Sequence, residues 1–429
     1  MDVGQPDPLA ARDPLIADYR LDALVKGIPP KASLRLADVG AQGWNLLRGD
    51  LPMPAAVLRT DILRRNSDWM MRFVRDQGLD LCPHGKTTMA PQLWALQIAD
   101  GCWGITVATV QQLSVALRFG VTRAILANQP VGRLAADACI AALATCDLHV
   151  LADSEAVVAG LAEAARRAPP ARPLKVLIEV GAVGGRTGAR TTEQALAVAR
   201  AVAAAPGLVV AGVEAFEGIL PDPAAVDSFL DGLVATAKAI AAESLFGTDE
   251  VLLTAGGTAF FDRIGPRFAV ADLARKVRRV LRSGCYITHD SAGYEDSYRR
   301  MRAEAALSFP DWDLQPALEI WAAVQSRPEP KLAILTLGKR DISYDSALPL
   351  PRFWFRPGAM EAPQPLAFHK VRALNDQHGY CVGPDNTPLQ VGDLVCLGIG
   401  HPCLTFDRWQ VMLLADGDYN VTGAIRTFF

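Results

Sequence analysis

The chain has 429 residues, of which half are apolar and 21% are charged, with 43 basic and 46 acidic side chains. That length is sufficient for two domains, or for one barrel with an additional domain. A formal net charge of −3 gives no electrostatic reason to bind DNA or RNA, so nucleic acid is disfavoured as a partner.

Insertion into a membrane and secretion are also disfavoured. No run approaches the roughly 20 uninterrupted apolar residues that a membrane helix needs. Residues 1–20 contain Asp and Pro where a secretory signal has a basic start and an apolar segment. The eight cysteines form no CxxC pair, which favours reduced thiols over a disulfide framework. We therefore expect a cytoplasmic protein whose residues 1–50 form an N-terminal extension.

Residues 51–300 alternate short β-branched runs with Ala-rich helical stretches, which is typical of βα units around a parallel sheet. A first strand and helix, at 56–78, either cover the floor of this unit or belong to another domain. The strand-like runs that follow are 79–86, 103–109, 124–128, 148–153, 174–181, 208–216, 250–257 and 280–289. Eight repeats predict an α/β fold with a (β/α)8 barrel.

Residues 301–429 have a different pattern. Short apolar runs are separated by Pro, Gly, Asp and Asn, which predicts an antiparallel β domain.

A barrel carries its chemistry at the carboxyl ends of its strands. The first run ends in His84-Gly85-Lys86, and side chains two apart on a strand share a face, so His84 and Lys86 are expected to point into the barrel mouth. A lysine in such a pocket can act as a Schiff-base nucleophile or a general base. Taken alone, a solvated or ion-paired lysine is the more common case.

Glycines at the last two strand ends indicate a phosphate site, because backbone N–H groups can approach an anion there. The residues concerned are Gly256, Gly257 and Thr258 after the seventh run, and Gly284, Cys285 and Tyr286 in the eighth. A lone Gly pair is usually a turn, but together with a strand-end lysine it suggests pyridoxal phosphate (PLP). Arg186, in a Gly-rich turn after the fifth run, either binds an anion or is a surface arginine.

In the β domain, His401 and Cys403 place an imidazole and a thiol on one face of a segment expected to be extended. Nitrogen and sulfur are zinc ligands, although such a pair also arises by chance. His378 is a further candidate, whereas His149, His289 and His369 are assigned to structural hydrogen bonds.

Several of these segments resemble a known family when taken together. They are PHGKT at 83–87, IEVGAVGGRTG at 178–188, AGGT at 255–258, RSGCYITHD at 282–290, QHG at 377–379 and GHPCLTFDRW at 400–409. The combination resembles fold-type III PLP enzymes of the D-serine dehydratase and D-threonine aldolase group, whose barrel is of the alanine racemase type.

The resemblance implies a role for each site residue. Lys86 would be bonded to PLP and would move the α-proton of the substrate, with His84 beside the cofactor. Arg186 would lie near the cofactor's 3-oxygen and Arg282 near its pyridine nitrogen. The residues at 256–258 and 284–285 would hold the phosphate, and Tyr286 would also contact the cofactor. His401 and Cys403 would coordinate a divalent metal ion, expected to be zinc.

The resemblance further implies the reaction. Aldolases of the group have an aspartate where Cys403 stands, so we expect a dehydratase that converts a β-hydroxy-D-amino acid into a 2-oxo acid and ammonia. The alternative is retro-aldol cleavage of the same substrate class. Phe216 replaces a usual tyrosine and Thr88 a usual histidine, which favours a divergent branch with a larger or more acidic substrate. The group also implies a homodimer.

Overall fold

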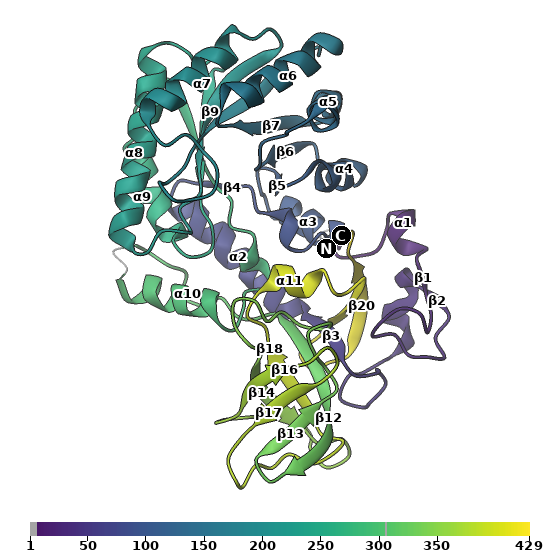
Figure 1. Cartoon of the computed structure of the whole chain (residues 1–429). Coiled ribbons are helices and arrows are strands. Elements are labelled where there is room, and N and C mark those ends of the chain that lie inside the picture. The colour runs from purple at the N-terminus through teal and green to yellow at the C-terminus, as the bar shows by residue number, and fades with distance from the viewer. Residues whose placement is uncertain (1–6, 305–306) are drawn as a thin grey trace, which may run out of the picture.

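The computed structural model describes residues 7–304 and 307–429, so the start of the predicted N-terminal extension, residues 1–6, lies outside the described residues. The chain forms a helix-covered sheet in one half of the molecule and a β domain in the other (Figure 1). No helix in the described ranges combines the length and apolar character needed to cross a membrane.

Eight parallel strands form the first half. In chain order they are β4 (Asp80–Leu81), β5 (Ile105–Val107), β6 (Arg123–Leu126), β7 (Asp147–Ala152), β8 (Leu174–Val180), β9 (Leu208–Ala215), β10 (Glu250–Ala255) and β11 (Lys276–Leu281). Their order in the sheet is β4-β11-β10-β9-β8-β7-β6-β5. The two ends meet where the Trp103 amide donates to the Leu81 carbonyl at 2.7 Å and the Thr106 amide to the Pro83 carbonyl at 2.9 Å. The predicted barrel is therefore confirmed.

Helices surround this barrel. They are α2 (Thr60–Asp76), α3 (Pro91–Ala99), α4 (Val110–Arg118), α5 (Arg133–Ala142), α6 (Glu155–Arg167), α7 (Thr192–Ala204), α8 (Pro223–Ala242), α9 (Ile264–Ala269) and α10 (Gly293–Glu304). The start of α8 shows how the local sequence fixes a helix end. Asp222 accepts a hydrogen bond from the Ala225 amide, and Pro223 occupies the first turn.

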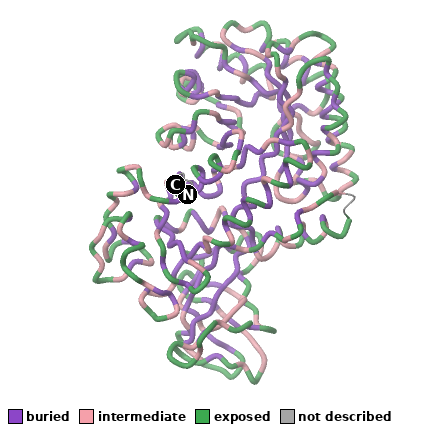
Figure 2. The backbone as a smooth tube through the Cα atoms, turned by 180° about the vertical axis from the view of Figure 1, so that it is seen from behind, coloured by how far each residue is buried: buried purple, intermediate pink, exposed green. Residues whose placement is uncertain are grey.

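The barrel interior is filled with side chains. The buried residues packed inside it are Cys82, Ile125, Leu151, Leu177, Ala211, Leu252 and Val280. A larger apolar layer lies between the strands and the helices, so that burial follows the inner side of the helices (Figure 2). Because the interior is packed, a ligand can bind only at an end of the barrel.

The second half is a β domain. Its strands are β3 (Ala55–Arg59), β12 (Leu318–Glu329), β13 (Leu332–Leu335), β14 (Leu350–Phe355), β15 (Gln364–Pro365), β16 (Lys370–Leu374), β17 (Gly379–Val382), β18 (Leu394–Gly398), β19 (Val411–Ala415) and β20 (Val421–Arg426). All pairings among them are antiparallel except that of β3 with β19, so the predicted antiparallel domain is confirmed. The early strand β3 pairs with β12 and β19, which places it in this domain and not in the barrel.

The segment before β3 contains α1 (Pro14–Ala17), β1 (Arg20–Leu21), β2 (Leu34–Arg35) and a 3-10 helix, η1 (Leu36–Gln42). Its apolar side chains, among them Leu21, Ile28 and Val39, share a core with Trp321 and Leu413 of the β domain. The N-terminal segment therefore packs on the β domain. The boundaries predicted at residues 50 and 300 stay a prediction.

Candidate active site

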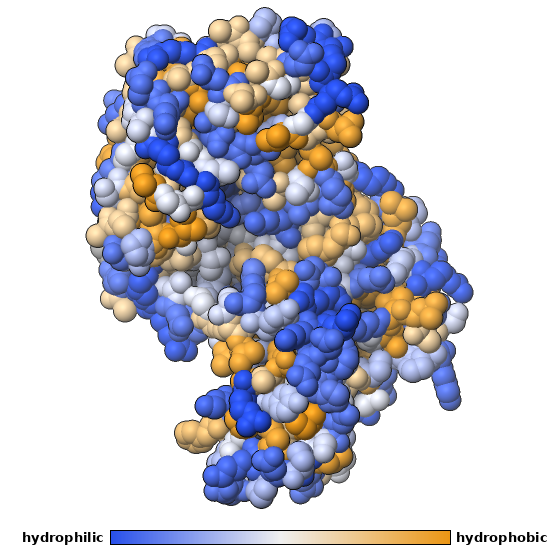
Figure 3. Space-filling model, viewed as in Figure 1, coloured by the Kyte–Doolittle hydropathy of each residue, from blue (hydrophilic) through white to orange (hydrophobic). Residues whose placement is uncertain are grey.

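A cavity of about 370 Å³ opens at the carboxyl ends of the barrel strands, where the barrel meets the β domain. The surface is hollowed between the two halves on the face shown in Figure 3. Ten of the twelve predicted site residues line the cavity, namely His84, Lys86, Arg186, Gly257, Thr258, Arg282, Gly284, Cys285, His401 and Cys403. Gly256 and Tyr286 do not.

Lys86 reaches the cavity from a turn, which differs from the expected strand. Strand β4 ends at Leu81, and Gly85–Thr87 form a 3-10 helix, η2. The turn is held tightly because a Cβ at Gly85 would come within 2.7 Å of Ile105 and Trp94 side-chain atoms. His84 lines the cavity beside Lys86, and burial, followed by the nearby Lys86 charge, lowers the pKa of His84. The imidazole is therefore neutral at pH 7.

Arg282 and Glu214 form a buried ion pair at the cavity wall. The Arg282 guanidinium also donates to the Thr254 hydroxyl at 3.2 Å and to the Ala215 carbonyl at 2.9 Å. Its Nε and the Oε2 of Glu214 have no partner among the described residues. These two orphaned polar atoms are available to a ligand in the cavity.

Three of the predicted cofactor-binding residues make other contacts within the protein. The carboxylate of Glu217, which is completely buried, accepts hydrogen bonds from the amides of Gly256 at 2.9 Å and Gly257 at 2.8 Å. Those two amides are thus already used, because a buried carboxylate requires partners. Tyr286 is fully buried and its hydroxyl accepts from the Gln97 side chain at 3.2 Å, outside the cavity.

The remaining part of the predicted phosphate site is open. Strand β11 ends at Leu281, so Gly284 and Cys285 lie in a turn that enters a 3-10 helix, η4 (Cys285–Ile287), and not in a strand as expected. In the described parts of the chain, the amides of Thr258, Gly284 and Cys285 have no protein acceptor. A cluster of free backbone amides suits a phosphate.

Arg186 belongs to a Gly-rich loop after β8. The Arg190 side chain organises this loop by donating to several of its carbonyls, including those of Thr187 at 2.6 Å and Arg186 at 2.7 Å. The guanidinium of Arg186 lies over the Phe216 ring, 4.4 Å from its centre. Arg186 therefore lines the cavity while remaining exposed to solvent.

His401 and Cys403 are brought into the same cavity by the β domain. The predicted extended segment is instead helical, since α11 runs from Pro402 to Phe406 with His401 at its N-cap. The Sγ of Cys403 lies 3.4 Å from the Thr87 hydroxyl, and Cys285 lies next to both groups.

The charges of this pair are coupled. A hydrogen bond from the Cys285 thiol, and then the adjacent His401, lower the pKa of Cys403. The Cys403 sulfur in turn raises the pKa of His401. The described residues contain no group of three His, Cys, Asp or Glu side chains able to hold a metal, so a metal here would have two protein ligands. His378 is exposed and does not line the cavity.

Sequence reasoning missed the acidic residues of the site. Glu179 lines the cavity and accepts hydrogen bonds from Gln129 and from Thr187, and Glu214 and Glu217 were equally overlooked. A signal was present, because Glu179 and Glu214 are the single acidic residues of their strands and lie near the ends of these mainly apolar segments. Asp345, whose Oδ2 lies 2.6 Å from the Nδ1 of His401, had no such signal.

The residues present fit the expected groups. A lysine, the orphaned atoms of His84, Glu214 and Arg282, and free amides line one cavity, which suits a phosphorylated heterocycle. An imidazole and a thiol side by side suit zinc, with coordination positions left for substrate and water.

Comparison with known proteins gives matches to both halves of the chain. The model of the alanine racemase N-terminal domain matches residues 58–260, and that of a putative serine dehydratase domain matches residues 317–415. A 3-hydroxy-D-aspartate aldolase of Paracoccus denitrificans is 26% identical over 377 residues, covering 84% of this chain and 88% of that protein. A D-threo-3-hydroxyaspartate dehydratase of Delftia sp. is 31% identical over 149 residues, covering 35% of this chain and 39% of that protein.

Solved structures share the fold. D-threonine aldolase from Filomicrobium marinum superposes with a TM-score of 0.74 at 23% identity, covering 90% of this chain and 97% of that one. The Delftia dehydratase gives a TM-score of 0.70 at 22% identity, covering 90% and 99%. The chain therefore belongs to the fold-type III PLP-dependent enzymes, with an alanine racemase-type barrel followed by a serine dehydratase-type β domain.

Proposed function

We propose that the protein is a PLP- and metal-dependent dehydratase that removes water from a β-hydroxy-D-amino acid and releases a 2-oxo acid and ammonia. The observation that carries this proposal is the meeting of Lys86 with His401 and Cys403 in one cavity. The substrate class is supported by the matched relatives, which are named for 3-hydroxyaspartate or threonine of D configuration.

In this proposal the barrel holds the cofactor. Lys86 would carry it covalently, Arg282 would lie near its pyridine nitrogen and Arg186 near its 3-oxygen. The amides of Thr258, Gly284 and Cys285 would hold its phosphate. Bound PLP supplies an electron sink that stabilises negative charge on the substrate's α-carbon.

The chain's own groups then handle the protons and the leaving group. The Nζ of Lys86 takes the α-proton as general base. His401 and Cys403 would hold a divalent cation, expected to be zinc, and such a cation would supply Lewis acidity beside the substrate's β-hydroxyl. His84 stays neutral because it is buried beside Lys86, so it adds no further positive charge next to the base.

A retro-aldol reaction is the second candidate. It is favoured by one observation on sequence similarity: the sequence alignment with the Paracoccus aldolase covers 84% of this chain, whereas that with the Delftia dehydratase covers 35%. Cys403 favours dehydration, because the aldolases of the group are expected to have an aspartate at that position. The products distinguish the two reactions.

The test is to incubate the purified protein with D-serine, D-threonine and D-threo-3-hydroxyaspartate, with and without EDTA. Dehydration of D-threonine yields 2-oxobutanoate and ammonia, whereas cleavage yields acetaldehyde and glycine. We expect 2-oxo acid from at least one of the three and its loss with EDTA. Aldehyde with glycine as the sole products would establish the second candidate instead.

A pair of cysteine variants tests the metal site. Cys403→Ala should lose metal and 2-oxo acid formation together. Cys381→Ala, a buried cysteine of the same domain that does not line the cavity, should retain both. Equal metal content in the two variants would contradict the assignment of Cys403 as a ligand.

A further inference from the structure

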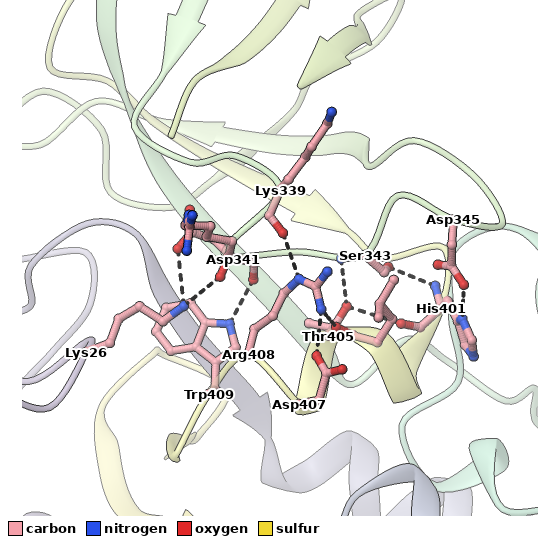
Figure 4. A network of polar contacts seen from close by, with 12 residues as sticks. Lys26, Lys339, Asp341, Ser343, Asp345, His401, Thr405, Asp407, Arg408 and Trp409 are labelled. Atoms are coloured by element: carbon pink, nitrogen blue, oxygen red, sulfur yellow. Dashed lines mark hydrogen bonds and ion pairs between the residues drawn. The ribbon is translucent and has the colours of Figure 1, made fainter. Parts of the chain in front are cut away.

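One ring nitrogen of His401 contacts a carboxylate that comes from a different segment of the β domain. The Nδ1 of His401 lies 2.6 Å from the Oδ2 of Asp345, as Figure 4 shows. Asp345 does not line the cavity, whereas His401 does. The contact is therefore made from outside the site.

This contact determines which ring nitrogen can bind a metal. A carboxylate only accepts, so the neutral imidazole must keep its proton on Nδ1 in order to donate to Asp345. The lone pair is then on Nε2. Histidines that bind metals commonly donate their other ring N–H to a carboxylate in this way, which fixes both the tautomer and the ring orientation.

The segment that carries Asp345 also holds the backbone of His401. The His401 amide donates to the Ser343 hydroxyl at 3.0 Å. Thr405 connects the two segments a second time, because its hydroxyl donates to the His401 carbonyl at 3.1 Å and accepts from the Ser343 amide at 3.1 Å. Residues 343–345 thus contact His401 through both main chain and side chain.

The same segment is anchored at Asp341. Its Oδ1 pairs with the Nζ of Lys26 at 3.2 Å, and its carbonyl accepts from the Trp409 indole at 2.8 Å. Lys26 comes from the N-terminal segment and lies over the Trp409 ring, 4.0 Å from its centre (Figure 4). The N-terminal segment, through Lys26, and the segment after α11, through Trp409, thus hold the segment at 341–345 that contacts His401.

We propose that Asp345 is a positioning residue that presents the Nε2 of His401 to the metal. The inference rests on the metal site of the proposed function. An ordinary surface ion pair is the competing explanation, since the two side chains are 43% and 37% exposed. Such a pair contributes little to stability, and its loss would have no effect on metal binding.

Zinc titration of the metal-free full-length protein, in competition with a chromophoric chelator, tests the proposal. Asp345→Asn should weaken zinc binding roughly 10- to 100-fold, which is the usual effect of losing such a partner, and should leave the melting temperature of the metal-free protein unchanged. Asp345→Glu keeps the acceptor and should retain most of the affinity.

The matched control is Asp407→Asn. Asp407 follows the other end of α11, is 38% exposed and pairs with Arg408, so the variant removes the same charge at similar exposure without touching His401. It should bind zinc like the wild type. If Asp407→Asn weakened zinc binding as much as Asp345→Asn does, the effect would come from the loss of any nearby negative charge. That result would overturn the proposal.

His401→Ala separates this inference from the proposed function. If the wild type binds zinc and His401→Ala does not, but Asp345→Asn and Asp345→Glu both bind as tightly as the wild type, only the positioning role is wrong. If the wild type binds no zinc, or His401→Ala binds it equally well, the metal site itself is wrong.

Discussion

The guanidinium of Arg282 is ion-paired with the carboxylate of Glu214, and these side chains are only 2% and 3% exposed. Burial is the main cause that raises the pKa of Glu214, opposed by the charge of Arg282. Because water does not reach them, the charge of Arg282 and that of Glu214 must be neutralised by one another.

Replacing one partner should destabilise the fold. Glu214→Gln leaves the Arg282 charge buried without a counter-ion, and we expect the free energy of unfolding to fall by roughly 3 kcal/mol in urea titrations. Glu243→Gln, which breaks the exposed pair with Arg200, should leave the unfolding midpoint in place. If the unfolding curves of Glu214→Gln and the wild type superimposed, Glu214 would not be needed to neutralise the buried charge of Arg282.

Lys86→Ala tests the covalent attachment of the cofactor. Without Nζ there is neither a nucleophile for PLP nor a base for the α-proton, so cofactor absorbance should be lost and turnover should fall by roughly a thousandfold or more. Lys175→Ala, at the opposite end of the barrel, removes the partner of Asp147 and should keep the absorbance. A coloured, active Lys86→Ala enzyme would exclude the PLP proposal.

Gly284→Ala should disturb the site through the backbone. A Cβ at this position would lie 2.5 Å from the carbonyl oxygen and 2.8 Å from the amide nitrogen of His84, and neither atom can move without shifting the turn that carries Lys86. We expect weaker PLP retention in dialysis and a loss of roughly 1–3 kcal/mol in the free energy of unfolding. Gly293→Ala, where a Cβ would meet nothing within 4 Å, should match the wild type in both measurements.

His289 should make the protein sensitive to acid. The side chain is completely buried, and burial lowers its pKa to about 4 from the model-compound value of 6.5. The unfolded chain therefore binds a proton below about pH 6.5 while the folded chain does not until about pH 4. Stability falls as the pH drops through this window, by up to roughly 1.4 kcal/mol per pH unit from this one group.

His289→Asn should remove that contribution. Asn tolerates the positive φ of 52° at this position and does not titrate. Urea unfolding across the window should give a shallower dependence on pH than in the wild type, and the same substitution at the exposed His378 should leave the slope unchanged. Equal slopes for all three proteins would contradict the buried neutral state of His289.

The strands of the barrel were predictable because parallel strands buried on both faces are short continuous apolar runs. The ends of the strands were not. The runs at 79–86 and 280–289 were expected to be strands throughout, but Gly85 and Gly284 pack against groups far away in the sequence, and a local pattern contains no information on such contacts.

The candidate site was predictable where a motif carried it, as with Lys86, His401 and Cys403. The helix at Pro402–Phe406 was missed although a proline in the first turn is a recognised helix start. The hydrogen bond from the Gly256 amide to Glu217 was not predictable from the sequence. The chain has 46 acidic residues, and only the tertiary fold decides which of them are buried.

The place of β3 has a consequence for biosynthesis. This strand leaves the ribosome before any part of the barrel, yet its neighbours β12 and β19 are translated only after the barrel is complete. Nascent chains must therefore keep Ala55–Arg59 without its sheet partners throughout most of translation. A gene fragment that stops after α10 would encode the barrel together with an orphan strand edge, which is a template for aggregation and not a separable module.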